Sequence, residues 1–349
     1  MTKSAGIAIY LFLATTIGLA QPLDYEGFFK RTSGWTGADG TYSFPLGEEG
    51  VVWGFSDTFF GEVVDNTRVA PFRFVNNSFV LQKEAELTFL KAPVFQPPDD
   101  VGWFWLFDGL RLEHPSSNQI LLGQFRTNGL AGAFAFEQCG LWWAEYAIDK
   151  EQQRVRVLRY RKLPYFVQNE KALVTFGSAI TQVGPWAYIY GILQQGLERK
   201  SVVARAPKAS LGEAGTWRFF DGESWQRDIW RAAPLFQGAS VEYSVHQSQS
   251  GQFVYIGNAE GGMHADIVAR RAPSPTGPWS EPIRVGQAPE HKDTVFVYNA
   301  KAHPELSQNG KILISYNVNT SDLDQVVNDA DIYRPRFLWW TPPSSEWLP

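Results

Sequence analysis

Hydrophobic and polar positions alternate in short runs along most of the chain, and no long segment has the 3.6-residue period of an amphipathic helix. The run "RVRVLRYRK" (154–162) alternates, which is typical of a strand with one solvent-facing side. The run "WAYIYGIL" (186–193) is apolar throughout, as strands covered on both faces are. Glycine and proline recur between the runs. Many short strands separated by turns predict an all-β fold.

Two stretches of the chain resemble each other and indicate a repeat. "WAYIYGILQQGLERKSVVARAP" (186–207) and "GQFVYIGNAEGGMHADIVARRAP" (251–273) each contain an aromatic strand, a polar loop and a strand ending in Val-Ala-Arg and Ala-Pro. Units repeating at about 65 residues are typical of β-propeller blades, and the chain has room for about five. We therefore predict a five-bladed β-propeller, in which residues 31–46 either supply an inner strand or close the ring. The predicted blades are 48–95, 103–163, 175–235, 240–285 and 294–340.

The N-terminus, "MTKSAGIAIYLFLATTIGLAQ", has the pattern of a secretory signal peptide. We expect residues 1–20 to be cleaved near Ala20, leaving 21–349 as a single domain. The alternative is an uncleaved anchor, although about 15 apolar residues are few for a bilayer span. The single cysteine, Cys139, allows no intramolecular disulfide. An exported chain without disulfides suits the bacterial periplasm or exterior, so we predict a secreted or periplasmic protein without membrane contact beyond the export signal.

Charge and composition exclude several classes of function. The net charge is −5 and there is no basic run, so we predict no nucleic-acid partner. The five histidines are scattered without metal-ligand spacing, and we predict neither a metal nor a cofactor. A Ca²⁺ ion held by aspartates and backbone carbonyls needs no local motif, so the sequence does not address it.

The stretch "GADGTYSFPLGEEGVVWGFSDTFFG" (37–61) contains the first candidate site. A hairpin of strands 41–46 and 51–56, centred between Glu48 and Glu49, would bring Asp39 and Asp57 to its open end, within one residue of facing each other. Inner strands of a propeller end at the mouth of a central channel. Paired carboxylates at such a mouth suit glycoside hydrolysis. Alternatively, Asp39 is a turn residue and Asp57 a capping acid.

Other polar residues extend this candidate site. Glu242 stands between apolar neighbours in "SVEYSV" and is either a third channel acid or a partner in a salt bridge between blades. Asn299, Lys301 and His303 alternate, so they share a face in extended chain and offer donors to hydroxyl or carboxylate groups. A pre-strand loop with satisfied turn residues is the alternative for these three.

Amide, arginine and aromatic side chains complete the predicted binding residues. One of Asn76 and Asn77 must face inward if "RFVNNSF" is a strand, and we assign Asn77 to the substrate. Arg334 would bind an anionic group, or pair with acids of a neighbouring blade. The aromatic residues expected to stack on sugar rings are Trp53, Trp105, Trp186 and Tyr190.

Several motifs together resemble those of a known family. They include "GADGTYSFPL", "VVWGFSDTFFG", "NNSFV", "SVEYSV", "YNAKAHPEL" and "YRPRF", and the resemblance covers most of residues 31–340. The chain is similar to exported five-bladed β-propeller domains of unknown function, neighbours of the arabinanase, levansucrase and invertase glycosidases. Some relatives of those domains are endo-D-arabinofuranases. The resemblance implies catalytic acids at Asp39 and Asp57, with Glu242 near the channel.

The sequence supports two hypotheses of different classes. The first is an exported glycoside hydrolase, acting on an arabinofuranan-type polysaccharide, that uses Asp39, Asp57 and Glu242. The second is a non-catalytic propeller that binds a glycan or another surface partner. A propeller fold serves both purposes, so the choice depends on the site.

Overall fold

The structure is a computed structural model that describes residues 23–114 and 116–349. The predicted signal peptide, residues 1–20, lies outside the described residues. Among the described residues, none of the helices has both the length and the apolar content that a membrane crossing requires.

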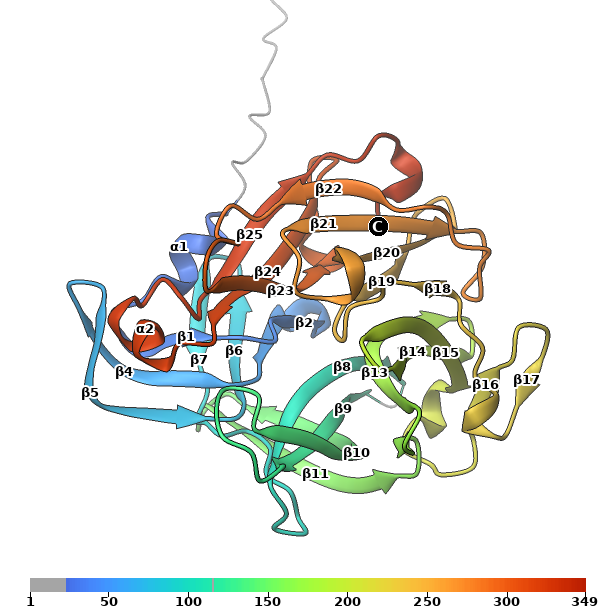
Figure 1. Cartoon of the computed structure of the whole chain (residues 1–349), viewed down its shortest axis with the longest axis horizontal. Helices are drawn as coiled ribbons and strands as arrows, with labels where there is room; N and C mark the ends of the chain where they lie inside the picture. Colours follow the sequence, from blue (N-terminus) through green and yellow to red (C-terminus); the bar gives the residue numbers. More distant parts are fainter. Residues whose placement is uncertain (1–22, 115) are drawn as a thin grey trace, which may run out of the picture.

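Strands dominate the described chain, and they form six sheets (Figure 1). The first two sheets are β1 (Ser33–Ala38), β4 (Thr58–Val64) and β5 (Thr67–Val75), and β2 (Tyr42–Pro45), β3 (Val51–Phe55), β6 (Ser78–Lys83) and β7 (Glu86–Phe89). The third is β8 (Trp103–Glu113), β9 (Ser116–Thr127), β10 (Phe136–Asp149) and β11 (Arg154–Leu163). The fourth is β12 (Val167–Gln168), β13 (Leu173–Val183), β14 (Trp186–Gln195), β15 (Glu198–Pro207), β16 (Arg218–Phe220) and β17 (Trp225–Gln226), with β18 (Phe236–Gln237) pairing β15.

The last sheet lies beside the first in Figure 1, and the fifth lies between the last and the fourth. They are β19 (Ser244–Gln247), β20 (Phe253–Asn258), β21 (Asp266–Ala272) and β22 (Ile283–Gln287), and β23 (Val295–Ala302), β24 (Ile312–Thr320) and β25 (Pro335–Trp340). The α-helices are α1 (Tyr25–Phe29) and α2 (Leu323–Asn328). The 3-10 segments are Gly47–Glu49, Lys208–Ser210, Ile229–Arg231, Ala259–Gly261, Pro304–Leu306 and Ser345–Trp347.

The pattern of each strand fits its place in its sheet. The alternating run 154–162 lies in β11, an edge strand whose residues are largely exposed or half-buried. The apolar run 186–193 lies in β14, an interior strand of its sheet, and is mostly buried. An interior strand is covered on both faces by neighbouring sheets, which explains why it lacks polar alternation.

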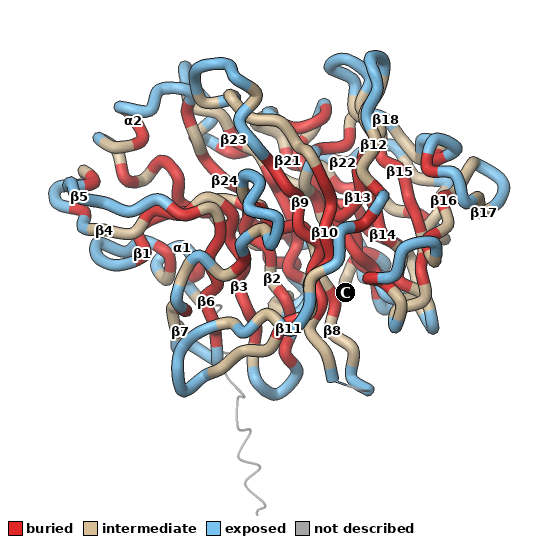
Figure 2. The backbone as a smooth tube through the Cα atoms, turned by 90° about the horizontal axis from the view of Figure 1, so that it is seen from below, coloured by how far each residue is buried: buried red, intermediate tan, exposed pale blue. Residues whose placement is uncertain are grey.

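The sheets are arranged in a ring. Hydrophobic cores lie between each sheet and the next along the chain. A further core contains Trp35, Trp53 and, from β24, Leu313, and so joins the last sheet to the first. Figure 2 shows the buried residues along the inner strands and the exposed ones in the loops. The prediction of an all-β, propeller-like fold is confirmed, whereas the predicted number of blades stays a prediction because the topology has six sheets.

At three places the chain passes directly from a strand of one of the first two sheets into a strand of the other, with a break of two or three residues between them. The chain passes from β1 to β2 through residues 39–41, from β3 to β4 through 56–57, and from β5 to β6 through 76–77. Residues 31–46 therefore supply strands to these sheets, as one of the two sequence alternatives had it. The three breaks contain both predicted aspartates and the pair Asn76 and Asn77.

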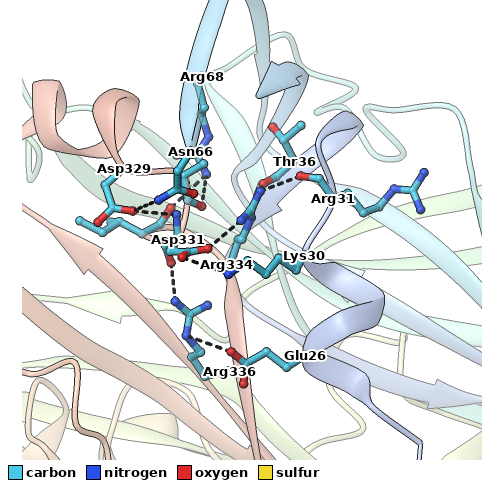
Figure 3. A network of polar contacts seen from close by, with 12 residues as sticks. Glu26, Lys30, Arg31, Thr36, Asn66, Arg68, Asp329, Asp331, Arg334 and Arg336 are labelled. Carbon is cyan, nitrogen blue, oxygen red and sulfur yellow. Dashed lines mark hydrogen bonds and ion pairs between the residues drawn. The ribbon is translucent and has the colours of Figure 1, made fainter. Parts of the chain in front are cut away.

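A polar network fastens the end of the chain to its beginning (Figure 3). The Arg334 guanidinium donates to the carbonyls of Thr36, at 3.1 Å, and Arg31, at 2.6 Å, and pairs with Asp331 at 2.8 Å. Arg68 donates to the Ile332 carbonyl at 3.0 Å. Arg334 is 3% exposed and its donors are occupied. The structure therefore corrects the assignment of Arg334 to substrate binding: this side chain closes the ring.

Candidate active site

Asp39 and Asp57 lie where one long hairpin changes sheets. The Asp39 N–H donates to the Asp57 carbonyl at 3.1 Å, and the Ser56 N–H donates to the Asp39 carbonyl at 2.9 Å. The predicted facing of the two acids is therefore confirmed, with the hairpin centred on Glu48. The hairpin does not end there, because β1 and β4 continue the pairing beyond the acids. A Cβ added to Gly40, where φ is +84°, would lie 2.9 Å from the Ser56 nitrogen, so the break depends on glycine.

Two tyrosines from the last sheet region hold the Asp39 carboxylate. The Tyr298 hydroxyl donates to Asp39 Oδ2 at 2.7 Å, and the Tyr333 hydroxyl donates to the same oxygen at 3.3 Å. Asp39 Oδ1 is buried and has no hydrogen-bond partner among the described residues. This second oxygen is therefore the one free to carry a proton.

Asp57 is held by donors from the other side of the hairpin. The Asn76 amide donates to Asp57 Oδ1 at 3.0 Å, and the Trp105 indole N–H donates to the same oxygen at 2.7 Å. Within the described ranges Asp57 Oδ2 accepts no hydrogen bond. Two donors on one oxygen favour the ionised form and leave the other oxygen available to a ligand.

Burial of the two acids raises the pKa of both. Burial raises the pKa of Asp39 well above its ordinary value, and the nearby charge of Asp57 raises it further. Burial raises the pKa of Asp57 to about 6, against the opposing hydrogen bonds from Asn76 and Trp105. Two interacting carboxyl groups titrate as a pair. Near neutral pH the pair thus provides one acid, Asp39, and one carboxylate, Asp57.

The third predicted acid lies next to this pair and carries its own counterion. Glu242 and Lys301 form a contact of 2.6 Å, with side chains 12% and 2% exposed. Lys301 also donates to the carbonyls of Gly40 and Asn299. Burial raises the pKa of Glu242 and lowers that of Lys301, while the contact between them opposes both shifts. Lys301 therefore joins Glu242, the Asn299 backbone and the Gly40 carbonyl next to Asp39.

Aromatic side chains connect the partners of the two acids into a circuit, which we call the aromatic collar: Trp105, Phe136, Phe134, Phe296 and Tyr298. Their ring centroids are 4.6 Å apart for Trp105 and Phe136, 6.5 Å for Phe136 and Phe134, 6.2 Å for Phe134 and Phe296, and 5.6 Å for Phe296 and Tyr298. Trp105 touches Asp57 and Tyr298 touches Asp39, so the collar runs from one acid to the other. Flat apolar faces beside acids suit sugar rings.

Two predicted stacking residues belong to the hydrophobic core instead. Trp53 is fully buried, and its indole N–H donates to Gln82 at 2.7 Å. Tyr190 is also fully buried, and its hydroxyl donates to the Pro275 carbonyl at 2.9 Å. Both aromatic rings fill spaces between sheets, which corrects their assignment to the channel.

Asn77 and His303 are likewise satisfied by the protein. Asn77 is 1% exposed, and its amide bonds the backbone of Val94, Phe95 and Phe104. His303 bonds the hydroxyls of Ser43, at 2.6 Å, and Ser315, at 2.7 Å. Burial lowers the pKa of His303 to about 3, so its ring is neutral. Neither side chain reaches the two aspartates, and Asn76 takes the place predicted for Asn77.

Sequence reasoning missed the two tyrosines that hold Asp39. Tyr298 directly precedes Asn299 in "VYNAKAH", but a bulge between Tyr298 and Lys301 changes the alternation of side chains there. Tyr333 lies in an irregular segment with φ of +71°, a region that no periodicity describes. The motif "YRPRF" begins with Tyr333, but it entered the sequence analysis only as part of the family resemblance.

The described residues contain no group of three or more His, Cys, Asp or Glu side chains placed to hold a metal ion. The hydrogen-bond donors around Asp39 and Asp57 are tyrosine hydroxyl, amide and indole groups. The candidate site therefore consists of acids, amides and aromatic side chains.

The raised pKa of Asp57 predicts a pH-dependent stability. An acid whose pKa is raised on folding stabilises the native state fully below its unfolded value, near 4, and loses that contribution as pH rises through about 6. Asp57→Asn should therefore become more stable relative to the wild type as pH rises from 5 to 8, by roughly 1.4 kcal/mol. Thermal unfolding at both pH values measures this.

Asp65→Asn is the matched control for this comparison, because Asp65 is an exposed residue of the turn between β4 and β5. Its stability relative to the wild type should not depend on pH in this range. An Asp57→Asn offset that is the same at pH 5 and pH 8 would contradict the burial of a charged Asp57.

One protein family matches nearly the whole chain. Its model, described as "Domain of unknown function (DUF5005)", covers residues 22–341. The chain belongs to this family.

Comparisons with individual proteins add a relative and two solved structures. Notoamide biosynthesis cluster protein J of Aspergillus sp. (strain MF297-2) is 28% identical over 160 residues, which are 43% of this chain and 41% of that protein. The chain thus matches less than half of that relative's length. A crystal structure from Bacteroides ovatus ATCC 8483, assigned provisionally as a hydrolase, has a TM-score of 0.71 and 20% identity over 90% of this chain and 88% of that chain.

The other solved structure is a glycoside hydrolase. It is an exo-β-1,3-galactanase variant of Phanerochaete chrysosporium with β-1,3-galactotriose, with a TM-score of 0.49 and 9% identity over 88% of this chain and 62% of that chain. At 20% identity, the likeness to the Bacteroides ovatus structure concerns the fold alone.

Proposed function

We propose that this protein is an exported glycoside hydrolase in which Asp39 and Asp57 carry out the reaction. The observation that carries the proposal is the facing of two half-buried carboxyl groups whose surroundings differ. Asp39 has an unpartnered oxygen and a pKa well above the ordinary value. Asp57 is stabilised as a carboxylate by two donors. Glycoside hydrolysis needs this combination of one acid and one carboxylate.

In this reaction Asp39 protonates the glycosidic oxygen as its bond to the anomeric carbon breaks. Asp57 then attacks that carbon or removes a proton from the water that does so. Glu242 stays paired with Lys301 and contributes its charge to the raised pKa of Asp39. The aromatic collar packs against the sugar ring.

We also propose that the ring has five blades. Sheets β1–β4–β5 and β2–β3–β6–β7 count as one bent blade in this description, because three strands run from one sheet into the other. A bend at the breaks brings the acids to the channel mouth. The arabinofuranan-type substrate rests on the resemblance of "SDTFFG" and "YNAKAHPEL" to a family with such members.

A glycan screen tests the proposal. The protein is incubated with arabinofuranan, xylan, galactan and β-glucan, and new reducing ends are measured. The wild type should release them from at least one glycan, and the double variant Asp39→Asn/Asp57→Asn should not. Binding of a glycan by the wild type without any release would instead support the non-catalytic glycan-binding propeller.

A further inference from the structure

A cavity of about 650 Å³ is lined by residues of β5, β8, β11 and the segment 93–98, and none of its lining residues belongs to the aromatic collar. Its volume is within the usual range for sites that bind small molecules. Asn76 lines this cavity and also donates to the Asp57 carboxylate at 3.0 Å. The cavity therefore begins one side chain away from the reacting group.

Two aromatic residues that line the cavity pack against hydrogen-bond donors of the two acids. Trp103 packs against Trp105, the donor to Asp57, with ring centroids 6.0 Å apart. Phe74 packs near Tyr333, the donor to Asp39, with centroids 6.3 Å apart. Phe74 is 46% exposed, so its face is available to a ligand. The wall of the cavity thus packs against a hydrogen-bond donor of each carboxyl group.

The remaining wall of the cavity is a proline-rich segment whose backbone is hydrogen-bonded to a buried asparagine. Residues 93–98 line the cavity and include three prolines. The buried Asn77 fixes this segment, since its amide oxygen accepts from the N–H groups of Val94 and Phe95, each at 2.8 Å. A wall built by prolines and anchored through a buried amide is preorganised for binding.

The lining has the chemistry of a site for a neutral ligand rich in hydroxyl groups. Its one charged side chain is that of Asp100. The other side chains are aromatic, proline, aliphatic or amide groups, among them Gln96 and Tyr160. Aromatic faces pack on the C–H faces of sugars, and amides exchange hydrogen bonds with their hydroxyls.

We propose that this cavity is a subsite for the part of an oligosaccharide that extends beyond the reacting sugar, so that the preferred substrate has more than two sugar units. The inference rests on the proposed function, because it places the cleaved bond at Asp57. The extended part of the substrate leaves the collar past Asn76 and lies between Phe74 and Trp103.

The test compares two phenylalanines of β5. Phe74 lines the cavity, whereas Phe72, which is 36% exposed, is not among the lining residues and is the matched control. For the glycan found in the screen above, kcat/KM is measured on its disaccharide and tetrasaccharide. Phe74→Ala should lower the tetrasaccharide-to-disaccharide ratio of kcat/KM by about tenfold, the upper value for one aromatic contact. Phe72→Ala should leave that ratio unchanged. Trp103→Ala should act as Phe74→Ala does.

The outcomes separate the subsite from the hydrolase. Turnover with an unchanged ratio in Phe74→Ala, or an equal change in Phe72→Ala, would overturn the subsite and leave the hydrolase intact. If no glycan is cleaved, the hydrolase fails, and the tetrasaccharides of arabinan, xylan and galactan are tested for binding by calorimetry. Binding that weakens about tenfold in Phe74→Ala alone would keep the cavity as a glycan site. Absence of binding would overturn it.

Discussion

Asp57→Asn is expected to lower the rate of glycan hydrolysis by roughly 10²–10⁴-fold, and Asp39→Asn by a similar factor. The first change removes the carboxylate and the second removes the proton donor. Asparagine retains an oxygen for the Asn76 and Trp105 donors of Asp57, or for the tyrosines of Asp39. The loss should therefore appear in kcat, measured at pH 6–7 by release of reducing ends, while the variants remain folded.

Asp65→Asn, which changes an exposed acid in the turn between β4 and β5, should keep wild-type turnover. The dependence of the wild-type rate on pH adds a second readout. The rate should rise as pH increases through about 6, where Asp57 ionises, and fall at higher pH, where Asp39 loses its proton. If Asp39→Asn or Asp57→Asn alone retains full turnover, the assigned pair is incorrect even for a true hydrolase.

Lys301→Met is expected to destabilise the protein by about 3–5 kcal/mol. The change leaves Glu242 buried without its counterion, and it removes the donor to the carbonyls of Gly40 and Asn299. Breaking one side of a buried pair is costly because the remaining charge loses its compensation. Urea or thermal unfolding measures the effect, which should also lower hydrolysis because Gly40 adjoins Asp39.

Lys292→Met is the control, since Lys292 precedes the same strand and its side chain is 79% exposed. Its cost should stay within about 1 kcal/mol. Adding Glu242→Gln to Lys301→Met should restore part of the lost stability, because both charges are then gone. Equal stability of Lys301→Met and Lys292→Met would show that Glu242 and Lys301 do not form a buried pair of charges.

The facing of Asp39 and Asp57 could be predicted because it depends on local information. A short turn around Glu48 fixes which residues of a hairpin oppose each other, and neighbouring strands need no tertiary context for that. The alternation that separates interior β14 from edge strand β11 is local in the same sense. The continuation of the hairpin beyond the acids was missed because two short breaks look like strand ends in sequence.

The surroundings of the acids could not be predicted in the same way. Tyr298 and Tyr333 meet Asp39 across more than 250 positions of sequence, which only the closure of the ring brings about. Trp53 and Trp105 are both aromatic residues in strands, but one fills the core and the other reaches Asp57. The choice between Asn76 and Asn77 depends on the break between β5 and β6, which sets which of two adjacent residues faces inward.

The contacts of Asp39 with Tyr298 and Tyr333 link chemical competence to completion of the chain. The first hairpin alone brings the carboxyl groups together early in synthesis, whereas the two hydroxyl donors of Asp39 arrive only with the last part of the chain. A nascent or C-terminally clipped molecule would contain both acids, with Asp39 lacking its two hydroxyl donors. The carboxyl pair in this architecture is therefore completed last, after the two ends of the polypeptide have met.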